Sequence, residues 1–74
     1  MDQETAAMIA LDVMAQEAEI TEGDEIVITY MEETEEGWYV ECNSRYFLET
    51  DNPLYALVAA PLMIYSDGSY RKIF

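Results

Sequence analysis

The sequence predicts an α+β domain, with an N-terminal helix packed on an antiparallel sheet of about four strands and a short helical crossover. Three observations predict this class. Residues 2–19 are rich in alanine, residues 25–43 contain two strand-like runs, and an Asp-Gly pair at 67–68 separates two further short apolar runs. The 74 residues suffice for one domain, residues 1–74. A chain of this size buries only about 60% of its unfolded surface, so a bound partner or a homodimer would add stability.

Residues 2–19 are expected to form the helix, because alanine has the best helix propensity and Asp2 can cap the N-terminus. One apolar stripe is expected to face the sheet. Its members are Ala7, Ala10, Leu11, Met14 and Ala18. Met8, Ile9 and Val13 flank the stripe, either as ordinary core and surface residues or, for Met8 and Ile9, as a contact for a partner.

Residues 25–31 form the first expected strand, because they are rich in β-branched side chains. Alternation places Tyr30 on the same face as Ile26 and Ile28. The acidic residues 32–36 then form the tip of a hairpin. Their carboxylates do not alternate as those of a calcium-binding loop do, so the sequence predicts no metal or cofactor site there.

Residues 37–43 form the second expected strand. The side chains that point to one face are Trp38, Val40 and Cys42. Tyr39 and Glu41 point to the other, exposed face. Trp38 is the largest side chain, so we expect it to be largely buried with the core built against it. A bulge or bend at 43–44 is expected to turn Phe47 inward.

The remaining elements follow from turn residues. Asp51 or Asn52 can cap a short helix that begins at Pro53 and spans one or two turns up to residue 59. Residues 61–65 form a strand opened by proline, and residues 66–69 form a tight hairpin turn with positive φ at its glycine. Residues 70–74 return antiparallel as an edge strand.

The runs Gly-Trp-Tyr-Val-Glu-Cys-Asn-Ser-Arg-Tyr-Phe-Leu-Glu-Thr-Asp-Asn-Pro (37–53) and Ala-Pro-Leu-Met-Ile-Tyr-Ser-Asp-Gly-Ser-Tyr (60–70) resemble the immunity protein 35 family, whose domain is also called YrhB-type. The likeness covers roughly residues 24–73. It implies a small antitoxin of bacterial polymorphic-toxin systems that neutralises a cognate toxin by binding it. The chain departs from the family pattern at 58–60, where Val-Ala-Ala replaces a usual Gly-Asn, and it stops at Phe74, where the family continues.

Sixteen carboxylates against Arg45, Arg71 and Lys72 give a formal net charge of −13. Such a surface repels nucleic acid and anionic membranes, and it favours rapid, salt-sensitive association with a basic protein. Nucleases are basic because they bind phosphates, so a nuclease toxin is one target that fits. The alternative interpretation is that the acidity only keeps a small protein in solution.

The sequence indicates no enzyme. It contains no histidine, and its one cysteine, Cys42, has no histidine partner and cannot form an intramolecular disulfide. Arg45 is expected to form ion pairs with nearby acids such as Glu41 or Glu49, and the alternative is that it binds a carboxylate of a partner. The acidic N-terminus lacks the basic region of a signal peptide, and no apolar run reaches the ~18 residues of a membrane span, so we expect a cytoplasmic protein.

We favour an immunity protein that binds and occludes a toxin. The alternatives are an acidic nucleic-acid mimic that inhibits a DNA- or RNA-binding protein, and a small chaperone-like protein, a role that has also been discussed for a YrhB-type domain. A binding interface would combine carboxylates for steering with tyrosines for contact area. The residues expected to contact the partner are Glu32, Glu33, Glu35, Glu36, Tyr39, Glu41, Glu49, Asp51 and Tyr55.

Overall fold

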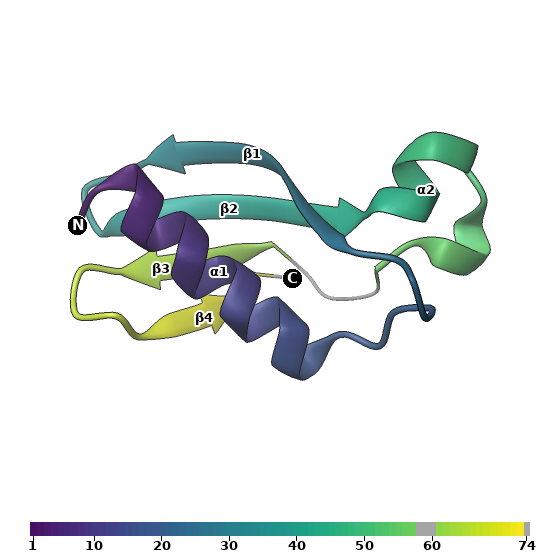
Figure 1. The fold of residues 1–74 in the computed structure, drawn as a ribbon. Coiled ribbons are helices and arrows are strands. Elements are labelled where there is room, and N and C mark those ends of the chain that lie inside the picture. The colour runs from purple at the N-terminus through teal and green to yellow at the C-terminus, as the bar shows by residue number, and fades with distance from the viewer. Residues whose placement is uncertain (58–60, 74) are drawn as a thin grey trace.

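The structure confirms the α+β class, with an N-terminal helix and a four-stranded antiparallel sheet (Figure 1). The computed structural model describes residues 1–57 and 61–73. The elements in chain order are α1 (Gln3–Glu17), β1 (Ile26–Glu33), β2 (Gly37–Ser44), α2 (Arg45–Thr50), the 3-10 helix η1 (Pro53–Tyr55), β3 (Leu62–Tyr65) and β4 (Tyr70–Lys72).

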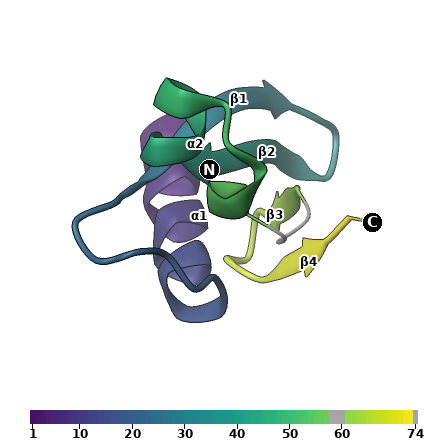
Figure 2. The ribbon, with the colours of Figure 1, turned by 90° about the vertical axis from the view of Figure 1, so that its right-hand side faces the viewer.

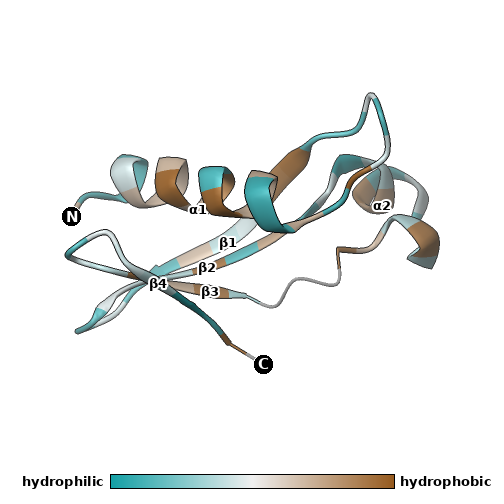
Figure 3. Ribbon diagram, turned by 90° about the horizontal axis from the view of Figure 1, so that it is seen from below, coloured by the Kyte–Doolittle hydropathy of each residue, from teal (hydrophilic) through white to brown (hydrophobic). Residues whose placement is uncertain are grey.

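The four strands lie side by side in chain order, and each neighbouring pair is antiparallel. α1 lies across one face of the sheet and contacts β1, β2 and β3 (Figure 3). The expected helical crossover from β2 to β3 contains η1 and, in addition, α2, which was not predicted; both lie at the end of the sheet away from the β1–β2 turn (Figure 1). No described helix covers the second face of the sheet (Figure 2).

The core lies between α1 and the middle of the sheet. Its buried members are Ala10, Val13, Met14, Val40, Leu62 and Ile64. The face of α1 that packs on the sheet differs from the predicted one. Val13, which was expected beside the stripe, is buried, whereas Leu11, which was expected within it, is 37% exposed. Apolar residues surround much of α1, so the sequence alone did not fix which side meets the sheet. Ala6 and Ala10 are fully buried, and such small side chains let the helix lie close to the strands.

Trp38 lies at the edge of this core. It is half-buried and packs against the buried cluster, and its indole Nε1 donates a hydrogen bond to the Met1 carbonyl at 3.0 Å. Most of the residue is therefore covered, as expected, but Trp38 packs against the buried cluster from its edge and does not form the centre of the core. Trp38 is the second residue of β2 and lies beside the segment that precedes α1, and part of the indole remains in contact with solvent.

Both ends of α1 are held by side chains. Asp2 caps the N-terminus as predicted, because its carboxylate accepts a hydrogen bond from the Thr5 amide at 2.8 Å. At the other end, Glu17 forms an ion pair with Lys72 at 3.0 Å and accepts a hydrogen bond from the Tyr70 hydroxyl at 3.2 Å. These contacts join the C-terminal end of the helix to the edge strand β4.

β1 contains a bulge that the sequence analysis did not predict. The register passes from Ile28 opposite Cys42 to Tyr30 opposite Glu41, which leaves Thr29 without a partner. This extra residue reverses the alternation of the strand. Met31 therefore packs against the core, whereas Tyr30 is 46% exposed, and the prediction that Tyr30 shares the face of Ile28 is wrong.

The predicted bulge at 43–44 is instead the junction of a strand and a helix. β2 runs through Ser44, and α2 begins at the next residue. Ser44 is the N-cap of α2, since its hydroxyl accepts a hydrogen bond from the Phe47 amide at 3.1 Å. α2 leaves Phe47 half-buried. The helix ends at Asp51, which adopts a left-handed conformation with φ 56°.

The turns after α2 match the predictions. Asn52 caps η1, which begins at Pro53, and Gly68 has φ +88° in the hairpin between β3 and β4. η1 spans Pro53–Tyr55, so the helix is shorter than predicted. Residues 58–60, which include the end of the predicted helix and the departure from the family pattern, lie outside the described residues, as does Phe74.

Candidate functional site

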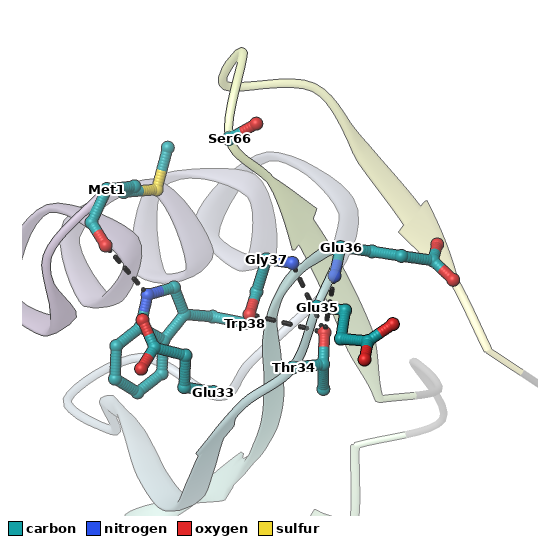
Figure 4. Close-up of a pocket in the computed structure, with 8 residues that line it drawn as sticks. All are labelled: Met1, Glu33, Thr34, Glu35, Glu36, Gly37, Trp38 and Ser66. Atoms are coloured by element: carbon teal, nitrogen blue, oxygen red, sulfur yellow. Dashed lines mark hydrogen bonds between the residues drawn. The ribbon is translucent and has the colours of Figure 1, made fainter.

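The β1–β2 turn is a compact, well-bonded structure (Figure 4). The amide of Thr34 donates to the Gly37 carbonyl at 2.7 Å, and the Thr34 hydroxyl accepts hydrogen bonds from the amides of Glu36 and Gly37, both at 3.2 Å. A side chain on Gly37 would collide with the carbonyl of Ile64 in the neighbouring strand. The turn therefore presents Glu35 and Glu36 on a rigid backbone, and both residues are exposed.

The four acids predicted to form one tip do not lie together on it. Glu32 and Glu33 belong to β1, and only Glu35 and Glu36 lie in the turn. Successive strand residues point to opposite faces. Glu33 faces the α1 side, where it lies with Trp38 in a small pocket (Figure 4), whereas Glu32 faces the side without a helix.

Tyr39 and Glu41 lie on the sheet face opposite α1, as predicted. The Tyr39 hydroxyl donates a hydrogen bond to the Glu41 carboxylate at 2.8 Å, and this bond raises the pKa of Tyr39. Tyr30 lies beside them, with its ring 6.0 Å from that of Tyr39 in an edge-to-face arrangement. Its hydroxyl donates to Glu32 at 3.1 Å, which raises the pKa of Tyr30. These four side chains form a compact group, which we call the tyrosine cluster.

Tyr30 was not among the residues predicted for this surface. Strict alternation along β1 placed Tyr30 with the core residues, and the bulge at Thr29 moves it to the open face. One sequence pattern could have indicated that Tyr30 belongs to this surface: a tyrosine followed two residues later by a glutamate. That spacing occurs in β1 as Tyr30 and Glu32, and again in β2 as Tyr39 and Glu41.

The remaining predicted contact residues lie at the other end of the molecule, around α2 (Figure 1). Glu49 forms an ion pair with Arg45 at 3.4 Å, and Asp51 is exposed at the end of the helix. Tyr55 is half-buried and packs edge-to-face on Tyr46, with 5.4 Å between ring centres. The molecule is 34 Å long. The predicted residues therefore form two separate groups, one near the β1–β2 turn and one around α2, and members of both groups make contacts within the protein.

The family described as immunity protein 35 matches residues 4–71 of this 74-residue chain. The chain belongs to the immunity protein 35 family. No curated protein and no solved structure matches it. Membership implies the role of an immunity protein in a toxin system, which suggests an inhibitor rather than a catalyst.

The Ser-Arg pair through which the chain resembles the immunity protein 35 family forms the junction between β2 and α2. Ser44 is buried, and its hydroxyl donates a hydrogen bond to Asp24, which also accepts from the amide of Tyr46. Burial would raise the pKa of Asp24, but the hydrogen bonds from Ser44 and Tyr46 lower it below its ordinary value. Arg45 forms an ion pair with Glu25 at 3.1 Å. An ion-paired Arg45 was predicted, and Glu49 is one of its partners, but Glu25 was not foreseen as the other partner and Asp24 was not foreseen as the acceptor for Ser44.

Cys42 lies on the α1 side of β2, where the sequence analysis placed it. It is half-buried against the core, and burial raises the pKa of its thiol to about 11. A thiol with this pKa is protonated at neutral pH and is a poor nucleophile. Within residues 1–57 and 61–73, no three acidic or cysteine side chains are grouped so that they could hold a metal ion. None of the described helices is both long and apolar enough to cross a membrane.

Proposed function

We propose that this protein neutralises a cognate toxin by binding it and covering its active site, without chemistry of its own. The observation that carries the proposal is the match to the immunity protein 35 family, which spans residues 4–71 and so includes the first three strands and most of β4.

The toxin in this proposal is a basic protein, and a nuclease fits that description. The chain has a formal net charge of −13, and its cations Arg45 and Lys72 already form ion pairs within the protein. Unpaired carboxylates attract a basic surface over several ångströms and accelerate the encounter. The exposed acids at the β1–β2 turn, with Tyr39 and Glu41 behind them, are the first contacts we propose. Glu49, Asp51 and Tyr55 would extend the interface only if the toxin reaches the far end of the sheet.

The direct test is to express this protein together with the product of the neighbouring gene, which is the candidate toxin. Co-expression is expected to restore the growth of cells that the toxin otherwise kills, and the two purified proteins are expected to elute as one complex in size-exclusion chromatography. Ile64→Asp is a suitable control, because Ile64 is fully buried and an unpaired charge there destroys the fold. If growth is not restored and no complex forms with the folded protein, the proposal is wrong.

A further inference from the structure

The face of the sheet opposite α1 is a surface with no described helix over it (Figures 2 and 3). The strand register places its side chains in rows. One row crosses the whole sheet, from Glu32 through Tyr39 and Met63 to Arg71. Tyr30 lies beside this row, opposite Glu41. We call this surface the open face.

The tyrosine cluster is at the β1–β2 side of the open face. The two aromatic rings are adjacent, and each hydroxyl donates a hydrogen bond to a glutamate two residues further along its own strand. Tyr30 lies opposite Glu41, and Tyr39 lies opposite Glu32, so each ring has carboxylates on two sides. The hydrogen bonds hold the carboxylates in place, and this reduces the entropy that binding would cost.

From this arrangement we infer that the open face receives a basic segment of the toxin. Arginine or lysine side chains of that segment pack on the rings of Tyr30 and Tyr39 and form ion pairs with Glu32 and Glu41. Aromatic rings and carboxylates side by side provide both of the interactions that a cationic side chain makes at interfaces. The inference rests on the proposed function, and it specifies the surface and the chemistry of the contact.

Charge complementarity favours a basic segment of the toxin over a second copy of this chain or a nucleic acid. A second copy of the chain also carries −13, so two open faces in contact would repel each other. Nucleic acid is repelled for the same reason. Arg71 is the one cation in the row, and it lies on the edge strand, with Met63 between it and Tyr39. The apolar flank of α1 around Met8, which is 67% exposed, has no comparable group of paired polar side chains among its pocket-lining residues.

Two matched charge reversals test this inference against the candidate toxin, purified with its active site inactivated. Glu32→Lys/Glu41→Lys reverses two charges on the open face. Glu19→Lys/Glu22→Lys reverses two exposed charges in the α1–β1 connection and changes the net charge equally. The open-face pair is expected to weaken binding about 100-fold, mainly through faster dissociation, because it places like charges in direct contact. The control pair is expected to slow association only, by about threefold.

If the protein with the two reversed charges does not fold, a second variant that only neutralises the same two glutamates still tests the inference. Glu32→Gln/Glu41→Gln preserves the shape of the side chains, and it is compared with Glu19→Gln/Glu22→Gln. Faster dissociation is expected for the open-face pair alone. If the Glu32/Glu41 and Glu19/Glu22 variants change the dissociation rate equally, the inference is wrong but the proposed function stands. The same conclusion follows if only Met8→Ala/Leu11→Ala abolishes binding. Failure of the unsubstituted protein to bind the toxin would overturn the proposed function itself.

Discussion

Trp38 stabilises the protein from the edge of its core. It is the only tryptophan, it lies opposite Ile64 in the β2–β3 register, and its indole N–H reaches the Met1 carbonyl. The side chain thus joins the sheet to the segment that precedes α1. Because the indole is half-buried, it contributes less free energy than a fully enclosed tryptophan would.

Trp38→Ala is expected to lower the free energy of unfolding by about 2–3 kcal/mol, below the range for a fully buried aromatic side chain. Trp38→Phe keeps a ring against the core but loses the hydrogen bond and some packed surface, so it is expected to cost about 1–2 kcal/mol. Urea unfolding followed by circular dichroism measures both variants without relying on tryptophan fluorescence. If the two substitutions cost the same, the ring contributes nothing through packing.

Gly37 and Gly68 both have positive φ, so replacing each of them by alanine gives two variants that can be compared directly. A methyl group at Gly37 would collide with the backbone of Ile64, whereas one at Gly68 would have open space around it. Gly68→Ala therefore costs only the left-handed conformation, about 1–2 kcal/mol. Gly37→Ala is expected to cost more, because the β2–β3 pairing must shift. Thermal unfolding of the two variants checks this order, and a lower melting temperature for Gly68→Ala would contradict it.

At the scale of elements, the β2–α2 junction depends on one carboxylate. Asp24 accepts hydrogen bonds from the Ser44 hydroxyl and from the amides of Glu25 and Tyr46. Ser44 in turn caps α2. With six residues, α2 is too short to be stable by itself in water, so these contacts determine whether it forms.

Asp24→Asn is expected to destabilise the protein more at pH 7 than at pH 3. The folded state lowers the pKa of Asp24, so the ionised carboxylate contributes stability above about pH 4. This contribution disappears as the pH falls through the folded-state pKa. Urea unfolding of the variant and of the unsubstituted protein is compared at each pH. The other acids are the same in both proteins, so the difference in the free energy of unfolding reports on Asp24 alone. Asp12→Asn, on the exposed side of α1, is the control, and an equal difference at both pH values would contradict the prediction.

The sequence predicted the elements that depend on local chemistry. Alanine content, the Asp2 cap, the two hairpin turns and the proline before β3 each determine local backbone structure. The bulge at Thr29 and the helix α2 were missed because both depend on distant partners. Thr29 donates a hydrogen bond to the Glu41 carbonyl in the next strand, and α2 begins where Ser44 meets Asp24. Neither contact has a signal in the adjacent sequence.

At the scale of the whole molecule, a net charge of −13 lies on a body only 34 Å long. The sequence predicted this acidity and the presence of tyrosine and glutamate at the candidate surface. It did not predict which acids lie together, because that arrangement follows from the register of β1 on β2. The excess negative charge both destabilises the compact state by self-repulsion and attracts a basic partner.

Salt is therefore expected to have opposite effects on the free protein and on its complex. Raising NaCl from 0.05 to 0.5 M shortens the Debye length from about 14 to about 4 Å, which screens the self-repulsion and raises the melting temperature. The same change slows association with the toxin. Calorimetry and stopped-flow kinetics measure the two effects. Glu19→Lys/Glu22→Lys reduces the negative charge, so salt is expected to raise its melting temperature by less. If salt raises the melting temperatures of this variant and of the unsubstituted protein equally, charge repulsion is not the cause of the rise.

The core joins the two ends of the chain, and this determines when the protein can fold. Ala10 and Met14 on the first helix pack in one cluster with Leu62 and Ile64 on the third strand, and Glu17 is bonded to Lys72 on the last. Closing so long a loop costs entropy before any of these contacts is made, which slows folding compared with a bundle of local helices. During synthesis on the ribosome, α1 emerges first and has no completed surface on which to dock. The core can assemble only after β3 has emerged, so the proposed binding surface becomes stable late in the synthesis of this domain.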